Sequence, residues 1–258
     1  MTACDPVTSG EGLWGGRRLV VASLPSTNRE AIANLERYQH GDVLVAREQT
    51  EGRGRMDRRW SSPDGKGLTF SVIINEHAPP LLIPTACGQA AAIGVLRLLQ
   101  GYGLTANLKW PNDVLVSHRK ICGILTERDP ETQTLVLGVG LNVNLERTDF
   151  AAMELRYPAT SLLHETGQTL DINVVLDRLT VCLANSLSLA APERRRDLAS
   201  EWNTLDAFVG QRIRVTIPGQ VMEGTHGGVA VDGALVVIDD DANRRVIYGG
   251  DVEGLSAI

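Results

Sequence analysis

The sequence changes character at about Phe208, and this change constrains the fold more than any other feature. Beyond it, short β-branched runs alternate with turns rich in Gly and Asp. The runs cover residues 213–217, 220–223, 229–231, 234–238 and 245–248. Five short strands within about 50 residues predict a small antiparallel barrel. We therefore expect two domains, a larger one over residues 1–207 and the barrel over residues 208–258.

The larger domain mixes strand and helix patterns. Apolar runs predict strands at residues 18–23, 43–46, 67–74, 108–110, 114–116, 123–127 and 134–144. The helix patterns cover residues 84–101, 171–189 and 192–208. A short helix also begins at Ser26-Thr27-Asn28, where Thr27 and Glu30 have the spacing of a capping box. The fold class is therefore α+β, and the small, polar residues 1–16 predict a flexible, loosely attached segment.

Composition excludes several classes of protein. The formal net charge is −6, whereas a protein that coats nucleic acid usually presents a broad basic face, so we expect no DNA binding. No apolar run approaches the ~18 residues of a membrane span, and no signal-peptide pattern opens the chain. These features predict a cytoplasmic protein without a membrane partner. The four cysteines and five histidines show no metal-ligand spacing.

Two cationic clusters stand out against this acidic background. The first is the turn Lys109-Trp110-Pro111-Asn112-Asp113, which Lys120 and Gly123 follow. The second is the run from Gln49 to Trp60, which contains Gly52-Arg53-Gly54-Arg55. Glycines let a backbone close on a ligand, and arginines supply fixed positive charge and forked donors. The two clusters indicate a site that collects several negative charges, such as a phosphate and a carboxylate.

Each segment also has a purely structural interpretation. The Gly-Arg run fits a solvated charged hairpin, since no Gly-Lys-Ser/Thr follows it and it is not a dinucleotide fingerprint. Ser26-Thr27-Asn28 fits a simple helix cap. Residues 138–142, which end an apolar run, fit a buried strand that turns at Gly140. Trp60 fits either the core or a lid over a base.

Together, in this order and spacing, the segments resemble the biotin protein ligase family. The pattern consists of the Ser26–Asn28 cap, Gln49 with the Gly-Arg run and Trp60, the 109–113 turn, Arg119-Lys120 with Gly123-Ile124, and Gly140-Leu141-Asn142. Met56-Asp57 departs from it, because the family carries a more basic or Gly-containing pair there. The resemblance extends from about residue 18 to the end of the chain. It implies a mixed-sheet catalytic domain like that of class II aminoacyl-tRNA synthetases and an SH3-like C-terminal barrel.

The two-function members of the family carry an N-terminal winged helix-turn-helix that represses transcription. Here 17 residues precede the first expected strand, which is too few for such a domain. The resemblance therefore implies the single-function ligase. Such an enzyme activates biotin with ATP to biotinyl-5′-AMP, and then transfers biotin to a lysine of a biotin carboxyl carrier protein, a subunit of acetyl-CoA carboxylase.

The resemblance also implies roles for individual residues. Lys120 bridges the biotin carboxylate and the α-phosphate, and Arg53 and Arg55 close over them, so these three are the expected catalytic residues. Biotin is expected to contact Ser26, Thr27, Asn28, Gln49, Gly52, Arg53, Gly54, Arg55, Lys120, Gly123 and Gly140, the last two glycines keeping the pocket wall flat. The nucleotide is expected to contact Arg55, Trp60, Lys109, Asn112, Asp113 and Asn142. Mg²⁺ is expected to enter with ATP, and Asp113 either orients the lysines or binds this ion through water.

Two alternatives stay open from sequence. A lipoate or octanoate ligase would share the fold and the adenylate chemistry, although the polar cap and Gln49 favour a polar head such as a ureido ring. A non-catalytic sensor of biotin or nucleotide is the second alternative, and Lys120 weighs against it. The sequence leaves the oligomeric state open, with a homodimer among the choices.

Overall fold

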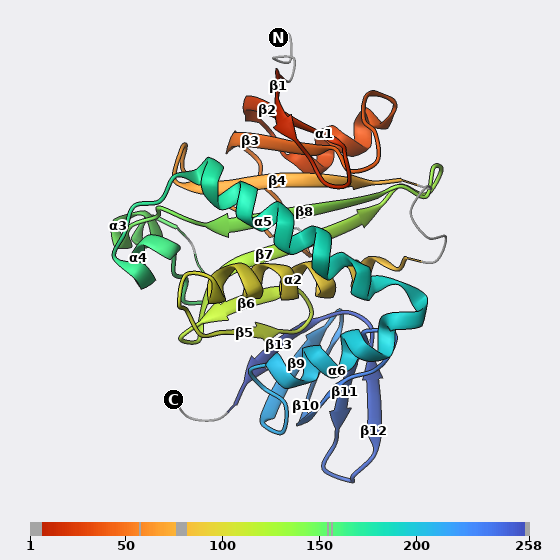
Figure 1. Cartoon of the computed structure of the whole chain (residues 1–258). Coiled ribbons are helices and arrows are strands. Elements are labelled where there is room, and N and C mark those ends of the chain that lie inside the picture. The colour runs from red at the N-terminus through yellow and green to blue at the C-terminus, as the bar shows by residue number, and fades with distance from the viewer. Residues whose placement is uncertain (1–6, 57, 76–81, 154, 156, 256–258) are drawn as a thin grey trace.

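An eight-stranded mixed sheet organises the larger domain (Figure 1). The computed structural model describes residues 7–56, 58–75, 82–153, 155 and 157–255. In spatial order the strands are β1 (Val7–Glu11), β2 (Arg17–Leu24), β3 (Val43–Gln49), β4 (Gly67–Ile74), β8 (Leu135–Asn142), β7 (Arg119–Arg128), β6 (Asp113–Val116) and β5 (Ala106–Lys109). Strands β2 and β3 pair in parallel, and the other neighbours are antiparallel. Because the ends of parallel strands meet at the same edge, residues after β2 lie beside the end of β3.

Helices cover both faces of this sheet. Helix α2 (Pro84–Gln100) and helix α5 (Ile172–Leu187) cross the front in Figure 1, and α1 (Thr27–Ala33) packs against β3, β4 and β8 over a second, smaller core. The small residues of α2 let α5 come close. A Cβ at Gly94 would lie 2.5 Å from Ser186 Oγ, so only Gly fits at this crossing. This close contact lets the two helices pack together over the larger core.

The segment Ile172–Ala190, which contains α5, is long and apolar enough to resemble a membrane span by composition. Its buried side chains, among them Leu176, Leu179 and Leu183, form one face that packs against α2. Asp177 and Arg178 interrupt the other face. The core accounts for the buried face of this helix, whereas Val174 and Val181 on its other face are exposed.

The structure corrects two expectations near the N-terminus. Residues 7–16 are attached to the domain, because β1 pairs with β2 and Leu13 is only 2% exposed. The turn after β1 is held tightly: Gly41 has a positive φ of +83°, and a Cβ there would lie 2.0 Å from Leu13 O. Residues 1–6 lie outside the described part of the chain.

The second correction concerns the cap of α1. The helix begins at Thr27 with Ser26 as N-cap, and no side-chain cap bond forms. Gln49 Oε1 instead accepts hydrogen bonds from Thr27 N (2.8 Å) and Thr27 Oγ1 (3.2 Å). The orphan N–H at the helix start is therefore satisfied from β3, so the capping box that Thr27 and Glu30 predict does not form.

The remaining predicted elements lie within a few residues of the observed ones, with additions. Two short helices, α3 (Arg147–Ala151) and α4 (Leu162–Thr166), were not predicted. The last helical stretch consists of 3₁₀ turns, η2 (Ser188–Ala190) and η3 (Pro192–Arg194), followed by α6 (Arg195–Leu205). A further 3₁₀ turn, η1 (Leu35–Arg37), follows α1.

A five-stranded antiparallel sheet forms the barrel domain. In spatial order its strands are β12 (Arg244–Ile247), β11 (Leu235–Ile238), β10 (Gln220–Val229), β9 (Arg212–Ile217) and β13 (Asp251–Gly254). The expected strands 220–223 and 229–231 are mostly one strand, β10, whose register with β11 shifts between His226 and Val229. Strand β13 was not predicted, because a four-residue run with two carboxylates carries little β pattern.

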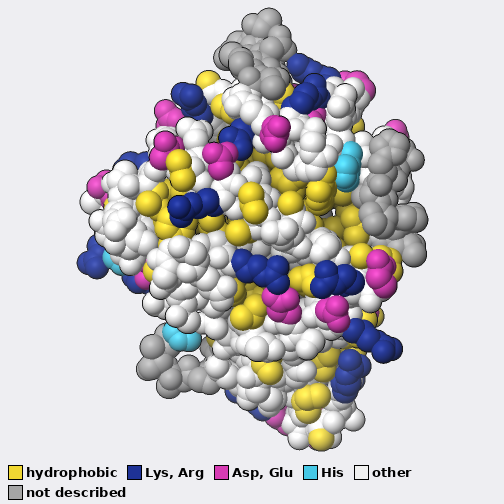
Figure 2. Space-filling model, viewed as in Figure 1, with side chains coloured by type: hydrophobic (Ala, Val, Ile, Leu, Met, Phe, Trp, Pro, Cys, Tyr) yellow, Lys and Arg dark blue, Asp and Glu magenta, His cyan; other side chains and the backbone are white. Residues whose placement is uncertain are grey.

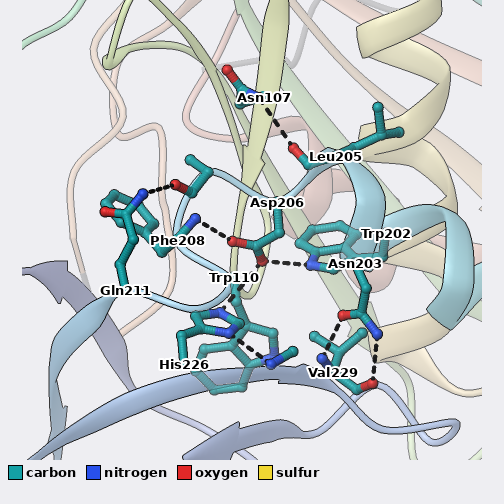
Figure 3. Close-up of polar contacts among 12 residues, drawn as sticks. Asn107, Trp110, Trp202, Asn203, Leu205, Asp206, Phe208, Gln211, His226 and Val229 are labelled. Atoms are coloured by element: carbon teal, nitrogen blue, oxygen red, sulfur yellow. Dashed lines mark hydrogen bonds and ion pairs between the residues drawn. The ribbon is translucent and has the colours of Figure 1, made fainter.

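A buried polar cluster joins the two domains (Figure 3). Asp206, fully buried just after α6, accepts hydrogen bonds from Trp202 Nε1 and Phe208 N, both at 2.9 Å. Its Oδ2 lies 3.5 Å from Nε2 of His226 on β10, and Nδ1 of that ring accepts from Gly228 N at 2.9 Å. Because Nδ1 is an acceptor, a neutral His226 carries its proton on Nε2, facing Asp206.

The junction continues toward the body of the larger domain. Asn203 accepts from Val229 N at 2.6 Å and donates to Val229 O at 3.2 Å, as Figure 3 shows. Gly233 O accepts from both Trp110 Nε1 and Gln89 Nε2 at 3.0 Å. Backbone groups of the barrel are thus paired with side chains of the larger domain, which fixes how the two pack.

We expect Asp206→Ala to destabilise the protein by about 2–3 kcal/mol, because it leaves buried donors of Trp202 and Phe208 without an acceptor and removes the carboxylate beside His226. The shift of the urea unfolding midpoint measures this. Asp240→Ala is the matched control, since it removes an exposed barrel carboxylate that pairs with Arg212 and should leave the midpoint unchanged. Equal midpoints for the wild type and Asp206→Ala would show that the junction does not stabilise the fold.

Candidate active site

A cavity opens where α1, the middle of β4, β7 and β8, the turn after β5 and the barrel domain meet. Beside it lies a segment called here the Gly-Arg loop, whose described residues are 50–56 and 58–60. Bonds between Trp60 N and Gly52 O (2.8 Å) and between Gly54 N and Arg58 O (2.7 Å) join its two sides. The lining residues are Ser26, Thr27, Asn28, Gln49, Arg53, Gly54, Arg55, Arg58, Arg59, Trp60, Phe70, Lys109, Trp110, Pro111, Asn112, Asp113, Lys120, Gly123, Ile124, Leu125, Gly138, Val139, Gly140 and Asp251.

One end of the cavity is lined by neutral polar groups. Gln49 Oε1 is held by Thr27, and the hydroxyl of Ser71 lies 2.7 Å from Thr27 Oγ1 and 2.6 Å from Asn28 Oδ1. All but Gln49 are buried. Their mutual bonds fix their orientation before any ligand arrives, so this end is preorganised for a small polar head.

Asn28 ties this polar end to β7 and β8. Its Nδ2 donates to Leu125 O (3.1 Å) and Glu127 Oε2 (2.8 Å). A Cβ at Gly138 would lie 2.4 Å from Asn28 Oδ1, so Gly138 is required for Asn28 to reach across the sheet. Gly138 was not among the expected site residues, although the Gly-Val-Gly spacing of residues 138–140 was a signal for it.

The glycines of the strands hold an aromatic ring. The ring of Trp60 lies against Gly140 and Gly123, where added Cβ atoms would approach it to 2.4 Å and 3.1 Å. The expected flat wall is therefore present, but Trp60 covers part of it. Lys120 Nζ lies 5.6 Å from the centre of the Trp60 ring, so the aromatic face also borders a cation.

The other end of the cavity carries an excess of positive charge. Its lining holds six basic side chains, and the described residues add only two carboxylates to it. Asp113 Oδ1 lies 2.5 Å from Lys120 Nζ, and Asp113 Oδ2 lies 4.0 Å from Lys109 Nζ. The second carboxylate, Asp251 of β13, pairs with Arg58. Such an arrangement attracts anions.

Burial acts on two of these cations. Burial lowers the pKa of Lys109 from its ordinary value to about 8, with Asp113 opposing the shift and Lys120 and Arg58 adding to it. Burial also lowers the pKa of Arg55, whose guanidinium lies 5.9 Å from the ring centre of Trp110. Both groups are desolvated cations, for which an anionic ligand would be a favourable partner.

Two expected site residues do not line the cavity. Asn142 is buried and its Nδ2 donates to Thr160 O at 2.9 Å, so its amide supports the segment before α4, and its contact with a nucleotide stays a prediction. Gly52 closes the base of the Gly-Arg loop, where a Cβ would lie 2.4 Å from Trp60 O. The structure brings the other expected residues together, including Asn112, whose amide bonds Ile124 O.

The barrel and a connecting segment supply residues that the sequence did not suggest. Asp251 lines the cavity. The Tyr157 ring packs against Lys109, whose Nζ lies 3.5 Å from the ring centre. Tyr157 Oη donates to Glu253 Oε1 at 2.9 Å. A lone aromatic in an irregular segment and a four-residue strand gave no pattern that could have singled them out.

The described residues hold no cluster of three or more His, Cys, Asp or Glu that could bind a metal ion. Of the residues that line the cavity, only Asp113 and Asp251 are acidic, and both are engaged with cations. Asp113 contacts both lysines of the cavity, and each of its two expected roles stays a prediction.

The face drawn in Figure 2, which α2 and α5 cover, shows no single dominant charge. Basic and acidic side chains alternate over it, with apolar groups between them. The cavity differs from this face, because its lining holds six basic and two acidic side chains.

Two protein-family models match the chain. A model of the biotin/lipoate A/B protein ligase family matches residues 20–144, and a model of the biotin protein ligase C terminal domain matches residues 208–253. The two matches cover the large sheet and the barrel respectively.

Curated relatives match over most of the chain. The biotin--[acetyl-CoA-carboxylase] ligase of Mycobacterium tuberculosis is 32% identical over 250 residues, which are 94% of this chain and 88% of the relative. The bifunctional ligase/repressor BirA of Bacillus subtilis is 29% identical over 246 residues, which are 92% of this chain and 74% of the relative.

Among solved structures, the biotin protein ligase from Aquifex aeolicus in complex with biotin and ATP has a TM-score of 0.79 at 24% identity, covering 93% of this chain and 99% of its own. This likeness shows a shared fold and confirms the expected class, a mixed-sheet α+β domain followed by a small SH3-like β domain. With family models on both domains and a relative 32% identical over nearly the full length, this chain belongs to the biotin protein ligase family.

Proposed function

We propose that the protein is a biotin–protein ligase, which activates biotin with ATP and transfers it to a lysine of a biotin carboxyl carrier protein in the cytoplasm. The observation that carries this proposal is one cavity with two different ends. Neutral hydrogen-bonding groups, set by Thr27 and Gln49, form one end, and the Lys109–Asp113–Lys120 cluster forms the other. The polar head of biotin needs the neutral hydrogen-bonding end. The reacting carboxylate and phosphate, which are both anions, need the basic end.

The head of the ligand would be recognised by the preorganised groups. A ureido ring offers two N–H donors and one carbonyl acceptor, which complement side chains such as Gln49, Thr27 and Ser26. An aliphatic or dithiolane head would shield the remaining donors and acceptors of these groups from water without bonding them, and that is unfavourable. This contrast supports biotin over lipoate or octanoate.

In the first step the biotin carboxylate attacks the α-phosphorus of ATP. A carboxylate O–P bond forms, the bond to the β-phosphate oxygen breaks, and pyrophosphate leaves. The difficulty is the approach of two anions, so positioned cations are the expected solution. Lys120 would bridge both reacting groups, while Arg53 and Arg55 from the Gly-Arg loop close over them and Lys109 and Asn112 hold the nucleotide.

Mg²⁺ would neutralise charge on the outer phosphates of ATP. Because Asp113 and Asp251 are both paired with basic side chains, the cavity fits an ion that arrives bound to the phosphates better than one held by dedicated carboxylates. The residues of the chain then act on the carboxylate and the α-phosphate.

In the second step the ε-amine of the carrier lysine attacks the carbonyl carbon of biotinyl-5′-AMP. The new C–N bond replaces the bond to the phosphate oxygen, AMP leaves, and the amine gives up its proton. The cationic rim would hold the phosphate of the departing AMP and stabilise the charge that develops on it.

Biotin-dependent ATP–pyrophosphate exchange, run beside lipoate and octanoate, tests this proposal. Exchange with biotin alone, followed by transfer to a carrier protein, is the expected result. Exchange with lipoate or octanoate would reassign the substrate, and biotin binding without exchange would identify a sensor.

We expect Lys120→Ala to stay folded and to slow adenylate formation by at least about 100-fold, the usual loss for one preorganised charge in a transition state. Single-turnover formation of biotinyl-AMP measures it. Lys66→Ala is the matched control, because Lys66 pairs with Glu146 and Asp149 away from the cavity. A normal rate in Lys120→Ala would remove Lys120 from its proposed role.

Arg55→Gly should release the adenylate prematurely. Arg55 is a desolvated cation from the loop that covers the cavity, so its loss weakens the hold on a reactive anhydride, which then acylates exposed lysines nearby. Retention of biotinyl-AMP on rapid filtration measures the effect, and Arg55→Lys, which keeps the charge, should be intermediate. If all three enzymes retain the adenylate equally, Arg55 has no closing role.

Gly140→Ala should weaken biotin binding by about tenfold or more, since overpacking a filled site costs about 1–3 kcal/mol. The new methyl group would lie 2.4 Å from the Trp60 ring and displace it. Calorimetric titration with biotin measures this, and the change should become nearly silent in a Trp60→Leu background, where no ring is left to displace. Additive effects of the two changes would argue against a steric cause.

A further inference from the structure

Strand β13 presents two carboxylates to the larger domain. Asp251 and Glu253 flank the fully buried Val252, so by strand alternation they project from the opposite face to this core residue. Asp251 pairs with Arg58 of the Gly-Arg loop, and Glu253 accepts the hydroxyl of Tyr157 at 2.9 Å. One short barrel strand thus reaches two parts of the cavity at once.

The contact between Glu253 and Tyr157 leads on to Lys109, which packs against the Tyr157 ring. Its side chain is only 8% exposed, its ammonium lies 3.5 Å from the centre of the Tyr157 ring, and Asp113 Oδ2 is 4.0 Å away. Asp113 is closer to Lys120, at 2.5 Å, so its charge is shared unequally between the two lysines. The nearest contact of the Lys109 ammonium is therefore the aromatic face.

The aromatic face is itself anchored by the barrel. Tyr157 belongs to an irregular segment, and its hydroxyl bonds to Glu253, with Val252 O at 3.5 Å. The bond at its hydroxyl keeps the Tyr157 ring beside the Lys109 ammonium. A cation–π contact stabilises a desolvated cation more than an exposed one. The Glu253 carboxylate also adds negative charge near a lysine that Lys120 and Arg58 repel.

We propose that Glu253 is a positioning residue for Lys109, acting through Tyr157, by which the barrel domain keeps a nucleotide-binding ammonium in place and charged. The effect on catalysis rests on the proposed function, since Lys109 acts there on ATP. The connection Glu253–Tyr157–Lys109 is a property of the fold, and it can be measured without any turnover.

The direction of the effect follows from the charges around Lys109. Asp113 and Glu253 favour its protonated form, whereas burial, Lys120 and Arg58 oppose it, and the pKa of Lys109 is about 8. Without the Glu253 carboxylate this balance moves toward the neutral amine. The lysine would then lose its charge at a lower pH than in the wild type.

The test uses four variants of the full-length protein. Glu253→Gln keeps an acceptor for Tyr157 but removes the charge, Glu253→Asp keeps the charge, and Tyr157→Phe keeps the ring but removes its anchor. Glu223→Gln is the matched control, because it neutralises a barrel carboxylate that pairs with Arg214 on the surface.

The first readout is the titration of Lys109 by NMR with isotope-labelled lysine, assigned through Lys109→Arg, between about pH 6 and about pH 9. We expect Glu253→Gln to lower the Lys109 midpoint by about half a unit, which is about a threefold change in the protonation ratio. Glu253→Asp, which keeps the charge, should keep the Lys109 midpoint close to the wild-type value. Tyr157→Phe should lower the midpoint, and Glu223→Gln should leave it unchanged.

The second readout is the pH profile of biotin-dependent adenylate formation. In Glu253→Gln, KM for ATP should rise about threefold near pH 8 and return toward the wild-type value near pH 6.5, where Lys109 is protonated in both proteins, while KM for biotin stays constant. A purely structural role for Glu253 would change these constants at every pH.

The two readouts separate the proposals. An unchanged Lys109 midpoint in Glu253→Gln overturns the positioning role, whatever the enzyme does. If Glu253→Gln lowers the Lys109 midpoint but the wild-type protein shows no biotin-dependent exchange, the positioning role of Glu253 is supported. Only the proposed ligase function is then contradicted.

Discussion

Positive charge gathered around one cavity is the constraint on which the rest of the structure depends. Like charges in a partly desolvated space repel one another, so each needs a partner that the fold itself supplies. Asp113 of β6 pairs with Lys120 of the neighbouring strand β7. Glu127 of β7 pairs with Arg53, and Asp251 of the barrel strand β13 pairs with Arg58. The sheet, the turn after β5 and the docking of the barrel are arranged so that these carboxylates reach the cations. The charge that is left uncompensated faces the cavity, where a phosphate would meet it.

Much of this site was predictable because its chemistry lies in short segments with unusual residue types. Lys109 to Asp113 sits in a turn between apolar strands, and Ser26 to Asn28 follows a strand end, so both segments had to lie at an edge of the sheet. Pairing β2 with β3 in parallel then brings Thr27 to Gln49. Local sequence carries such information because strand ends and helix starts are set by near neighbours along the chain.

What the sequence could not supply depends on how distant segments dock. Tyr157 and Glu253 meet only because the barrel packs against the end of the larger sheet, and the hydrophobic pattern of neither segment encodes that contact. The same limit explains Asn142, a polar residue at a strand end that looked free to meet a ligand but bonds Thr160 instead. Thr27 has the local pattern of a capping box, yet its hydroxyl bonds the side chain of Gln49, which is distant in sequence. Tertiary partners override local preference in both cases.

The two ends of the cavity come from different parts of the sheet. The polar end is built on α1, β3 and β4, whereas the basic residues come from β5, β7 and the Gly-Arg loop, with Asp113 of β6 and Asp251 of the barrel beside them. Few residues belong to both sets, with Arg53 and Asn28 as the link through Glu127. An ancestral gene could therefore have changed which acid is recognised by substitutions near Thr27 while selection on the phosphate-handling groups remained intact. Such separation allows one scaffold to diversify into enzymes for different acids that share a single activation chemistry.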